Sequence, residues 1–442
     1  MRIVAGLLAL VVTALAAGPA AAALSLIRDA EIEHSLERIA WPLFRAAGVN
    51  PASVHLYIVE DREPNAFVAG GQNIFIHTGM LTELDTVDQL RAVIAHELGH
   101  ITGGHLARRD QGMQGARGVA AIGMLGAAAA AVGGSPQAAV AIAATASQAA
   151  GRTALAYGRT EEASADQAGL RYLAAAGSDP QAMLDVLDHF RGQEALLGNY
   201  ADPYAQNHPL WSDRIALIED RVAKMPTGEP PNAETTYWHA RMVAKLDAFL
   251  ASPAQTLSRY PPSDDSEPAQ LARAVAWHRR PDPTKARAAI DELIAARPDD
   301  PYYLELKGQF LLEAGQAAEA ADAYRQAVAL APKEPLILGG LGRALLNMSD
   351  DGNTVEARDV LARSFAADKA NADVLRDLAL AEARLGNEGV AALATAERFT
   401  LEGRFKDASR SAARASALLP EGSPGWRRAE DISSIAKRAL KK

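Results

Sequence analysis

The residues with the clearest chemical potential are two histidines and a glutamate in the segment Ala95 to His100, which reads AHELGH. If this segment is helical, His96 and His100 lie one turn apart on one face, so their imidazoles can bind the same metal ion. Glu97 then lies beside them as a general base that can take a proton from an attacking water. The spacing predicts a metal-dependent hydrolase that cleaves peptide bonds.

A catalytic zinc ion usually has three protein ligands, so this HExxH motif needs one more. His105 is the nearest candidate, but it lies about half a turn around the helix from His96, and we expect a surface or capping residue. A second predicted helix carries Glu162 and Asp166 at four-residue spacing. Glu162 could complete a His-His-Glu zinc site, and Asp166 could accept the free ring N–H of a ligand histidine. The alternative is a solvated acidic helix start.

A further histidine, His208, stands in the segment NHPLWSDR, on a predicted loop before a helix that begins near Ser212. A loop histidine can reach a metal, and in the fourth coordination position it would displace water and hold the enzyme latent. Two alternatives remain: a contact with the substrate or its oxyanion, and a residue that ties the last helix of the domain to the core.

The composition narrows the classes of protein and of metal site. The 442 residues are 49% hydrophobic, which is enough for two or three separate cores. A net charge of -9 and a pI near 5.7 argue against a general nucleic-acid or anionic-lipid binder. Because the chain has no cysteine, it has no disulfides, thiolate zinc clusters or cysteine nucleophile, and a metal must be held by histidine and carboxylate.

The first residues have the pattern of a secretory signal peptide. Arg2 precedes an apolar run that ends near Ala17, and Ala21 and Ala23 form an A-x-A cleavage site. We therefore expect residues 1–23 to be removed and the mature chain to be periplasmic. The alternative is an uncleaved anchor, although the run is shorter than the ~20 residues that a membrane span needs.

The periodicity after the signal predicts an α+β domain that is mostly helical. Residues 28–47 have the apolar spacing of an amphipathic helix, and residues 55–59 and 73–77 have that of strands, for which we expect a small antiparallel sheet. Residues 118–150 are almost entirely Ala, Gly, Val and Ile, with a break at residues 133–136. They predict a helical hairpin, either packed within the domain or in peripheral contact with lipid or the active site.

A repeat of 34 residues dominates the C-terminal part from about Glu267. Gly308 and Gly342 are separated by this period, and so are Pro298 and Pro332. The period and the placement of small residues are typical of tetratricopeptide repeats, an all-α solenoid, in which a large residue such as Tyr324 fills the space to the next helix pair. We expect about four such units.

Beyond these patterns, several motifs together resemble one known family. They are HELGH, the preceding NAFVAGGQNIFIHTGML, the segment from Arg159 to Asp166, and His208-Pro209 followed by Arg214. The chain resembles the zinc metallopeptidase family of the CAAX prenyl protease and HtpX, and its signal and repeats are most similar to the periplasmic BepA-like members. The resemblance implies a gluzincin-like domain with Glu162 as third zinc ligand and a structural Asp166. One departure is Ser164, where the family has a second glutamate.

The sequence predicts four regions: a signal peptide (1–23), a zinc metalloprotease domain (24–228), a helical linker (229–266) and a tetratricopeptide-repeat domain (267–442). The expected function is endopeptidase activity on extended polypeptides, paired with the edge strand near residues 73–77. The resemblance implies quality control or assembly of outer-membrane β-barrel proteins, with the assembly machinery as a partner of the repeats. The alternative is a chaperone or scaffold with occasional proteolysis. Prenyl-protease activity is disfavoured because the sequence lacks spanning helices.

Overall fold

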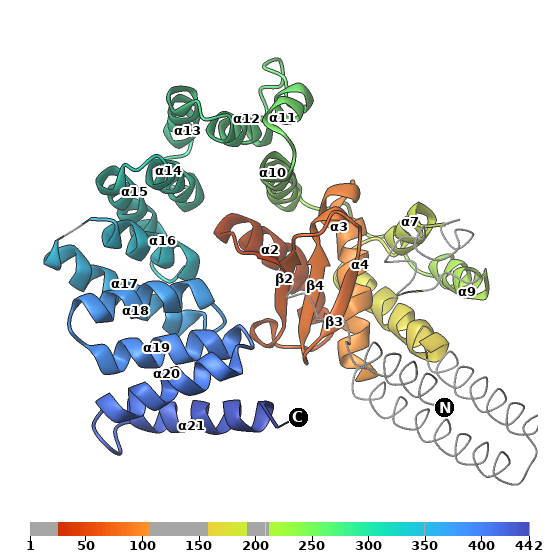
Figure 1. Cartoon of the computed structure of the whole chain (residues 1–442). Helices are drawn as coiled ribbons and strands as arrows, with labels where there is room; N and C mark the ends of the chain where they lie inside the picture. The colour runs from red at the N-terminus through yellow and green to blue at the C-terminus, as the bar shows by residue number, and fades with distance from the viewer. Residues whose placement is uncertain (1–24, 106–157, 192–207, 209–211, 349, 442) are drawn as a thin grey trace, which may run out of the picture. The chain divides into compact units, whose positions relative to one another are not determined.

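The computed structural model describes residues 25–105, 158–191, 208, 212–348 and 350–441 (Figure 1). The predicted signal peptide and the predicted hairpin at residues 118–150 lie outside these residues. The chain divides into two compact units, the first containing the described residues of Met1–Ile27 and Pro42–Pro230, and the second containing Arg28–Trp41 and Pro231–Lys442. The division falls within helix α2 (Ala30–Ala46), which has Pro42 in its interior.

The first unit contains a four-stranded sheet in the order β1-β2-β4-β3. The strands are β1 (Leu26–Ile27), β2 (His55–Val59), β3 (Ala66–Ala69) and β4 (Asn73–His77). Gly70 and Gly71 have positive φ angles of 60° and 103°, which the tight turn of the β3–β4 hairpin requires. The predicted antiparallel sheet is wrong in one pairing, because β2 runs parallel to β4. The connection between β2 and β4 contains β3, so β4 lies inside the sheet and β3 forms its edge.

Helices pack beside this sheet in the first unit. They are the 3₁₀ helix η1 (Pro51–Ser53), α3 (Thr78–Glu83), α4 (Val87–Thr102), an unlabelled helix over residues 158–175, α7 (Gln181–His189) and α9 (Ser212–Val222). The inward-facing isoleucines of the sheet, Ile58, Ile74 and Ile76, are buried. Helix α4 contacts both β3 and β4, which places its histidines next to the sheet edge.

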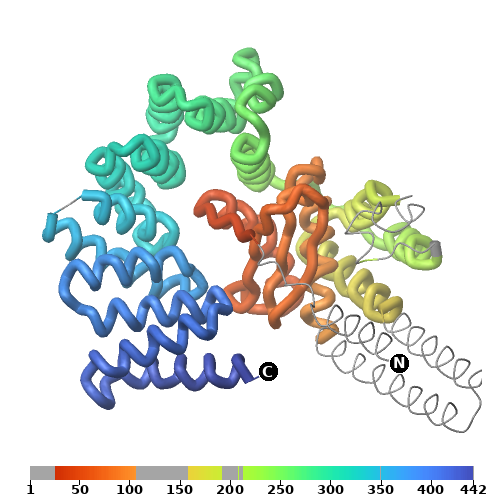
Figure 2. The backbone as a smooth tube through the Cα atoms, in the orientation of Figure 1, coloured from red at the N-terminus to blue at the C-terminus, as the bar shows by residue number. Residues whose placement is uncertain are grey.

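The second unit is a succession of helix pairs that lie side by side (Figure 2). Its helices are α10 (Ala233–Leu250), α11 (Pro253–Arg259), α12 (Glu267–Arg279), α13 (Pro283–Ala296), α14 (Pro301–Glu313), α15 (Ala317–Leu330), α16 (Pro335–Leu346), α17 (Asp351–Ala367), α18 (Ala372–Arg384), α19 (Glu388–Leu401), α20 (Phe405–Leu418) and α21 (Pro424–Ala439). Several helices begin with a proline in the first turn, where the helix needs no backbone N–H; they are α12, α13, α14, α16 and α21. The predicted α+β class with a repeat solenoid is confirmed.

Tyr324 on α15 shows why the repeat needs glycine. A Cβ atom on Gly308 would lie 2.7 Å from the Tyr324 ring, and one on Gly340 of α16 would lie 2.3 Å from it. Both distances are below van der Waals contact, so only glycine admits the ring between α14 and α16. Tyr324 therefore fills the space between successive pairs, as the repeat pattern predicts.

The N-terminal half of α2 belongs to the second unit through buried ion pairs. Arg241 on α10 donates to Glu31 at 2.6 Å, and both side chains are fully buried. Lys245, one turn further along α10, lies 2.8 Å from Asp29 and 3.3 Å from Glu31. Residues 28–41, which sequence periodicity places with the metalloprotease domain, thus complete the core of the repeat unit.

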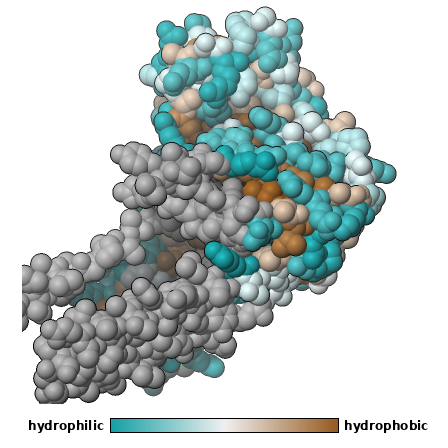
Figure 3. Space-filling view, turned by 90° about the vertical axis from the view of Figure 1, so that its right-hand side faces the viewer, coloured by the Kyte–Doolittle hydropathy of each residue, from teal (hydrophilic) through white to brown (hydrophobic). Residues whose placement is uncertain are grey.

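The described residues contain no helix that combines the length and apolar character needed to cross a bilayer. On the face drawn in Figure 3, apolar side chains show as patches between hydrophilic ones. Of the residues described in α9, Leu217 is an exposed large apolar side chain.

Candidate metal centre

Helix α4 presents the HExxH motif from a well-defined start. Thr86 caps the helix by accepting from the backbone N–H of Gln89, and the Gln89 side chain accepts from the backbone N–H of Thr86. This capping box fixes the first turn, so the positions three turns later are set by the helical repeat. His96 and His100 consequently project from one face, and both are buried, with relative exposures of 3% and 5%.

The helix over residues 158–175 crosses α4 at backbone contact. A Cβ atom on Gly99 would lie 2.6 Å from the carbonyl oxygen of Ala165, and one on Gly169 would lie 3.2 Å from the Ala95 carbonyl. Small residues on both helices thus allow a close crossing, and the carboxylate one turn before Ala165 is brought to the imidazoles of α4. Gly99, at a variable position of HExxH, is therefore needed to give space for this crossing.

Four side chains converge at this crossing: His96, His100, Glu162 and His208. One potential ligand atom from each lies within 4.8 Å of all the others. The two Nε2 atoms of His96 and His100 are 3.2 Å apart, and the two Glu162 oxygens take one each, with Oε2 3.3 Å from His96 Nε2 and Oε1 3.3 Å from His100 Nε2. Two imidazoles and one carboxylate form a donor set that zinc accepts at catalytic sites, so the residues fit the metal that the motif predicts.

His208 faces two groups at once. Its Nδ1 lies 3.1 Å from His96 Nε2 and 3.0 Å from Glu162 Oε2. Its Nε2 lies 3.3 Å from a carboxylate oxygen of Glu97 and 3.3 Å from the backbone oxygen of Ala66. The predicted loop histidine is therefore inside the cluster, between the metal-ligand candidates and the general-base candidate. Glu97 is fully buried beside it.

Asp166 and Arg214 support the cluster from behind. Asp166 accepts from His96 Nδ1 at 2.9 Å, which leaves Nε2 of that ring directed at the other ligands. Arg214 on α9 donates twice to Asp166, at 2.7 and 2.8 Å, and also to the backbone oxygen of His208 at 3.0 Å. One fully buried guanidinium thus joins the carboxylate behind His96 to the loop that carries His208.

The same contacts set the pKa values of the cluster. Burial alone would lower the pKa of His96, but hydrogen bonds to Asp166 and Glu162 raise it to about 10. Burial dominates at His100 and lowers its pKa. At Glu162 and Asp166 burial is outweighed: His208 and the ligand histidines hold the pKa of Glu162 well below its usual range, and Arg214 lowers the pKa of Asp166 to about 2. Both carboxylates are therefore anionic at neutral pH, as ligands and their partners must be.

His105 differs from its predicted surface position. It is buried, with 1% exposure, and its Nδ1 lies 2.9 Å from Nδ1 of His100. A Cβ atom on Gly103 would lie 2.3 Å from the His105 ring, so glycine makes room for it. His105 is not one of the four convergent residues, as its angular position relative to His96 on a continuous helix predicts. The helix is interrupted by a turn at Gly103 and Gly104, and this turn directs the His105 ring back to His100.

Comparisons with known proteins address the identity of this arrangement. Residues 27–222 match Peptidase family M48, and residues 254–301, 279–335 and 305–363 match tetratricopeptide repeats. The M48 match contains all four convergent residues. The chain is a metalloprotease with tetratricopeptide repeats, and the family resemblance carried by its motifs is confirmed.

Curated relatives extend the similarity over both units. A protein named beta-barrel assembly-enhancing protease from Escherichia coli (strain K12) is 27% identical over 416 residues, which cover 90% of this chain and 81% of the relative. The protein of the same name from Yersinia pestis is 25% identical, covering 84% of this chain and 76% of the relative. The mitochondrial metalloendopeptidase OMA1 of Schizosaccharomyces pombe is 28% identical, covering 42% of this chain and 51% of that protein.

The site contains every residue predicted for it, together with contacts that the sequence did not predict. The residues predicted for the site, His96, Glu97, His100, Glu162, Asp166 and His208, all lie in or against the cluster. The tethering contacts of Arg214 were missed. Arg214 was part of the motif that carries the family resemblance, but nothing in the sequence indicated which side chains it contacts. The edge strand was also misassigned, because β3 and not residues 73–77 is the edge on the side of the cluster.

Proposed function

We propose that this chain is a periplasmic, zinc-dependent endopeptidase that cleaves unfolded or misassembled polypeptides during the quality control or assembly of outer-membrane β-barrel proteins. The observation that carries the proposal is the convergence of His96, His100 and Glu162, with Glu97 on the same helix and within reach of the same space. The names of the relatives, which refer to β-barrel assembly, support the proposed process.

In this proposal His96, His100 and Glu162 hold the zinc ion, which when bound polarises the scissile carbonyl and lowers the pKa of water. Glu97 takes a proton from the attacking water and passes it to the leaving amine. Asp166 fixes the ring of His96 through the 2.9 Å contact at Nδ1, so the opposite nitrogen stays in place. Arg214 keeps Asp166 and Glu162 ionised and oriented.

We infer that the substrate binds as an extended strand beside β3. This strand is the edge of the sheet next to the cluster, and the Ala66 oxygen lies 3.3 Å from His208. A peptide paired with β3 would be held through its main chain, which supports cleavage without strong sequence preference. This placement replaces residues 73–77, which are paired on both sides by β2 and β3.

We also propose that His208 holds the resting enzyme latent. Its Nδ1 is grouped with the three ligands, and its Nε2 faces Glu97, so its ring stands between the proposed metal ligands and the proposed base. Removing the ring would open this space. His208→Ala should therefore raise the initial rate of casein cleavage, and an unchanged or lower rate with normal zinc content would refute latency.

The central experiment measures zinc content and casein cleavage of the mature chain in three forms. The wild type should hold about one zinc ion, Glu162→Ala should lose it, and Glu97→Gln should keep it while cleavage falls by about 10²- to 10⁴-fold. A folded wild type without bound metal would refute the proposed enzyme mechanism. The second candidate function, a scaffold that acts through the repeats, is supported by the size of the second unit, and would be favoured if Glu97→Gln rescued a deletion strain fully.

A further inference from the structure

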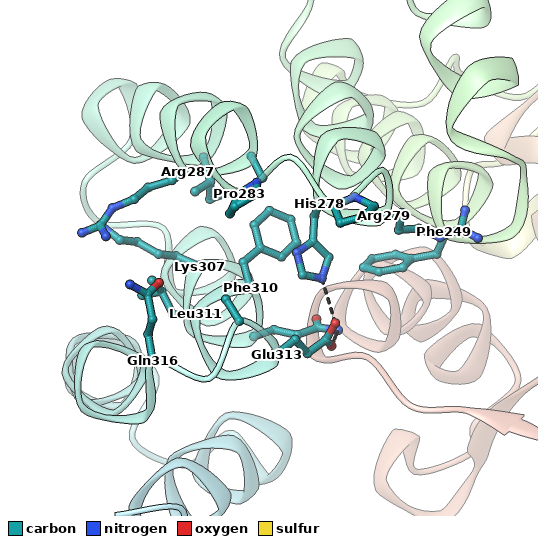
Figure 4. A pocket seen from close by; sticks show the side chains of 15 residues that line it. Phe249, His278, Arg279, Pro283, Arg287, Lys307, Phe310, Leu311, Glu313 and Gln316 are labelled. Atoms are coloured by element: carbon teal, nitrogen blue, oxygen red, sulfur yellow. Dashed lines mark hydrogen bonds and ion pairs between the residues drawn. The ribbon is translucent and has the colours of Figure 1, made fainter.

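The second unit contains a cavity of about 850 Å³ (Figure 4). The cavity is formed by the end of α12, the start of α13 and the end of α14, with one side chain from α10. Its volume is within the range of about 300–1,000 Å³ that is typical of ligand sites. All the residues that line it lie in the repeat unit, and none of them belongs to the metal cluster.

Aromatic side chains form one part of the cavity. The rings of His278 and Phe310 are stacked, with centroids 4.1 Å apart and planes inclined by 9°. His278 Nε2 lies 2.7 Å from a carboxylate oxygen of Glu313, and this contact holds the imidazole in the stack. Phe249 places a further ring beside them (Figure 4). An apolar ring entering here would meet fixed aromatic surfaces, against which stacking or edge contacts are favourable.

Polar heads gather at the other end. Figure 4 shows Arg287, Lys307 and Gln316 on the side of Phe310 away from Phe249, and Arg287 and Lys307 both approach Asp291, at 3.9 and 2.6 Å. Arg287 pairs with Glu319 at 2.8 Å and Lys307 pairs with Asp291 at 2.6 Å. Both acidic partners are nearly half exposed and neither lines the cavity. Because such exposed pairs contribute little, a ligand carboxylate can compete for the two cations.

The charge of the lining is opposite to that of the whole chain. Three cationic side chains (Arg279, Arg287 and Lys307) and one anionic side chain (Glu313) line the cavity, which gives +3 - 1 = +2, whereas the chain carries -9. Arg279 is occupied by the backbone oxygens at the end of α10. Arg287 and Lys307 are therefore the cations that a bound carboxylate would meet, and it would bind them by replacing Glu319 and Asp291 as their partners.

Helix geometry sets the spacing between the two parts. Lys307 and Phe310 are three residues apart on α14, so they lie on one face with about 5–6 Å between their Cβ atoms. On α13 the same spacing relates Arg287 to the apolar Ile290, which also lines the cavity. A ligand that contacts both parts must therefore present an apolar ring and an anion within a short stretch of its chain.

We propose that this cavity binds a segment of unfolded polypeptide in which an aromatic side chain stands next to Asp or Glu. The aromatic ring packs against Phe249 and the His278–Phe310 stack, and the neighbouring carboxylate is held by Arg287 and Lys307. The inference deepens the proposed function, on which its biological purpose rests, because it gives the repeats a way to select a client. The binding itself requires no proteolysis.

The test uses fluorescence anisotropy with the full mature chain carrying Glu97→Gln, which keeps the probe intact. The probe is a fluorescein-labelled peptide of sequence GSGSFDGSGS. Its C-terminus is amidated, so the Asp side chain supplies the acidic group of the peptide. Matched peptides replace Phe by Ala or Asp by Asn. Each replacement should weaken binding by about tenfold, since each removes one of the two recognised groups.

Variants of the chain locate the binding site. Arg287→Gln and Lys307→Gln should each weaken binding of the probe by about tenfold. Arg325→Gln is the matched control, because Arg325 is a similarly exposed cation, paired with Glu356 outside the cavity, and it should leave binding within about twofold. The charge-reversed variant Arg287→Glu should bind a peptide with Lys in place of Asp better than the original probe.

No binding of the Phe-Asp peptide, equal binding of the Asn peptide, or equal loss in Arg325→Gln would overturn the proposal. Only variants whose melting temperature equals that of the Glu97→Gln parent are compared. Phe310 is not substituted, because it is part of the hydrophobic core. Failure of the proposed function is separable: a wild type without metal or casein cleavage that still binds the probe would refute the protease role and leave this site standing.

Discussion

The two units each bury a cluster of charged and ionisable groups, and the clusters differ in what satisfies their carboxylates. In the first unit, Glu162 faces three imidazoles whose nitrogens converge within 4.8 Å. In the second unit, Glu31 faces the permanently charged Arg241 and Lys245, which are themselves fully buried. Arg241 also pairs with Asp300 and lies over the ring of Tyr303. Burial alone therefore does not distinguish a reactive cluster from a structural one.

The two clusters differ in whether their nitrogen atoms have lone pairs that can bind a metal. Imidazole nitrogens can direct lone pairs at a common point, whereas Arg and Lys have only hydrogens to donate. The first cluster has one permanent cation, Arg214, and its imidazole nitrogens can also bind a metal cation, whereas the described cations of the second cluster are Arg and Lys side chains without lone pairs. This comparison leads to four predictions, which perturb the clusters in turn.

The largest effect is expected from Arg241→Met in the second unit. It leaves Glu31 and Asp300 buried without their main cation, and removing one partner of a buried pair costs about 3–5 kcal/mol of unfolding free energy. Urea unfolding measures the change. Arg428→Met is the control, since its pair with Glu397 is half exposed on the arginine side and should cost at most about 1 kcal/mol. Equal losses in both variants would contradict a structural role for the buried cluster.

Metal removal should act on the first unit instead. A ligand at about 100 times its dissociation constant stabilises the folded state by about 2.7 kcal/mol, so a chelator should lower the melting temperature of this unit by roughly 5–10 °C. Calorimetry with and without chelator, followed by zinc add-back, measures the shift. The Arg241→Met chain should show the same zinc-dependent shift as the wild type. A chelator shift that zinc does not reverse would count against a metal in the cluster.

A smaller change is expected for Asp166→Asn. The amide still accepts from His96 but loses the charge that Arg214 neutralises, so metal affinity should fall by about 10- to 100-fold. Competition with a chromogenic chelator gives the affinity. Asp213→Asn, at an exposed position of α9, should leave it unchanged. An unaltered affinity in Asp166→Asn would mean that the ring of His96 is held by packing alone.

Stability should also depend on pH through Glu305, which lies 3.8 Å from Lys245 in the second cluster. Burial, aided by Asp29 and Glu31 and opposed by Lys245, raises the pKa of Glu305 to about 8. The folded chain thus keeps a proton that the unfolded chain releases near pH 4.5, and stability falls as the pH rises from about 4.5 to 8. Glu305→Gln cannot titrate, so its stability relative to the wild type should increase from pH 5 to pH 8. Parallel pH profiles would contradict the raised pKa.

The centre of the site could be predicted from the sequence because its geometry is helical. His96 and His100, and likewise Glu162 and Asp166, each share one helix face, and four-residue spacing is a local property. The repeats were accessible for the same reason, since small residues such as Gly308 and Gly342 recur at a fixed period of 34 residues. Helical spacing thus paired the residues within each helix, whereas the assignment of Glu162 to the same site as His96 and His100 rested on the family resemblance.

The parts that sequence reasoning missed all depend on chain segments that are distant or irregular. The hairpin of β3 and β4 has its signal in Gly70 and Gly71, but no local pattern shows that β2 pairs with β4, so the edge strand was misassigned. His105 is redirected by a turn that a continuous helix would not contain. Arg214 and Asp166 are 48 residues apart, and only the folded chain shows their pairing.

Helix α2 has a consequence for the order in which the chain folds. Glu31 emerges during synthesis 210 residues before its partner Arg241, and Arg28 emerges 340 residues before Asp368. Contacts at such sequence separations form late, because the intervening chain must first be produced and ordered. The solenoid is therefore completed only when its earliest segment is returned to it, and a fragment that begins at residue 231 would leave Arg241 and Lys245 without Glu31.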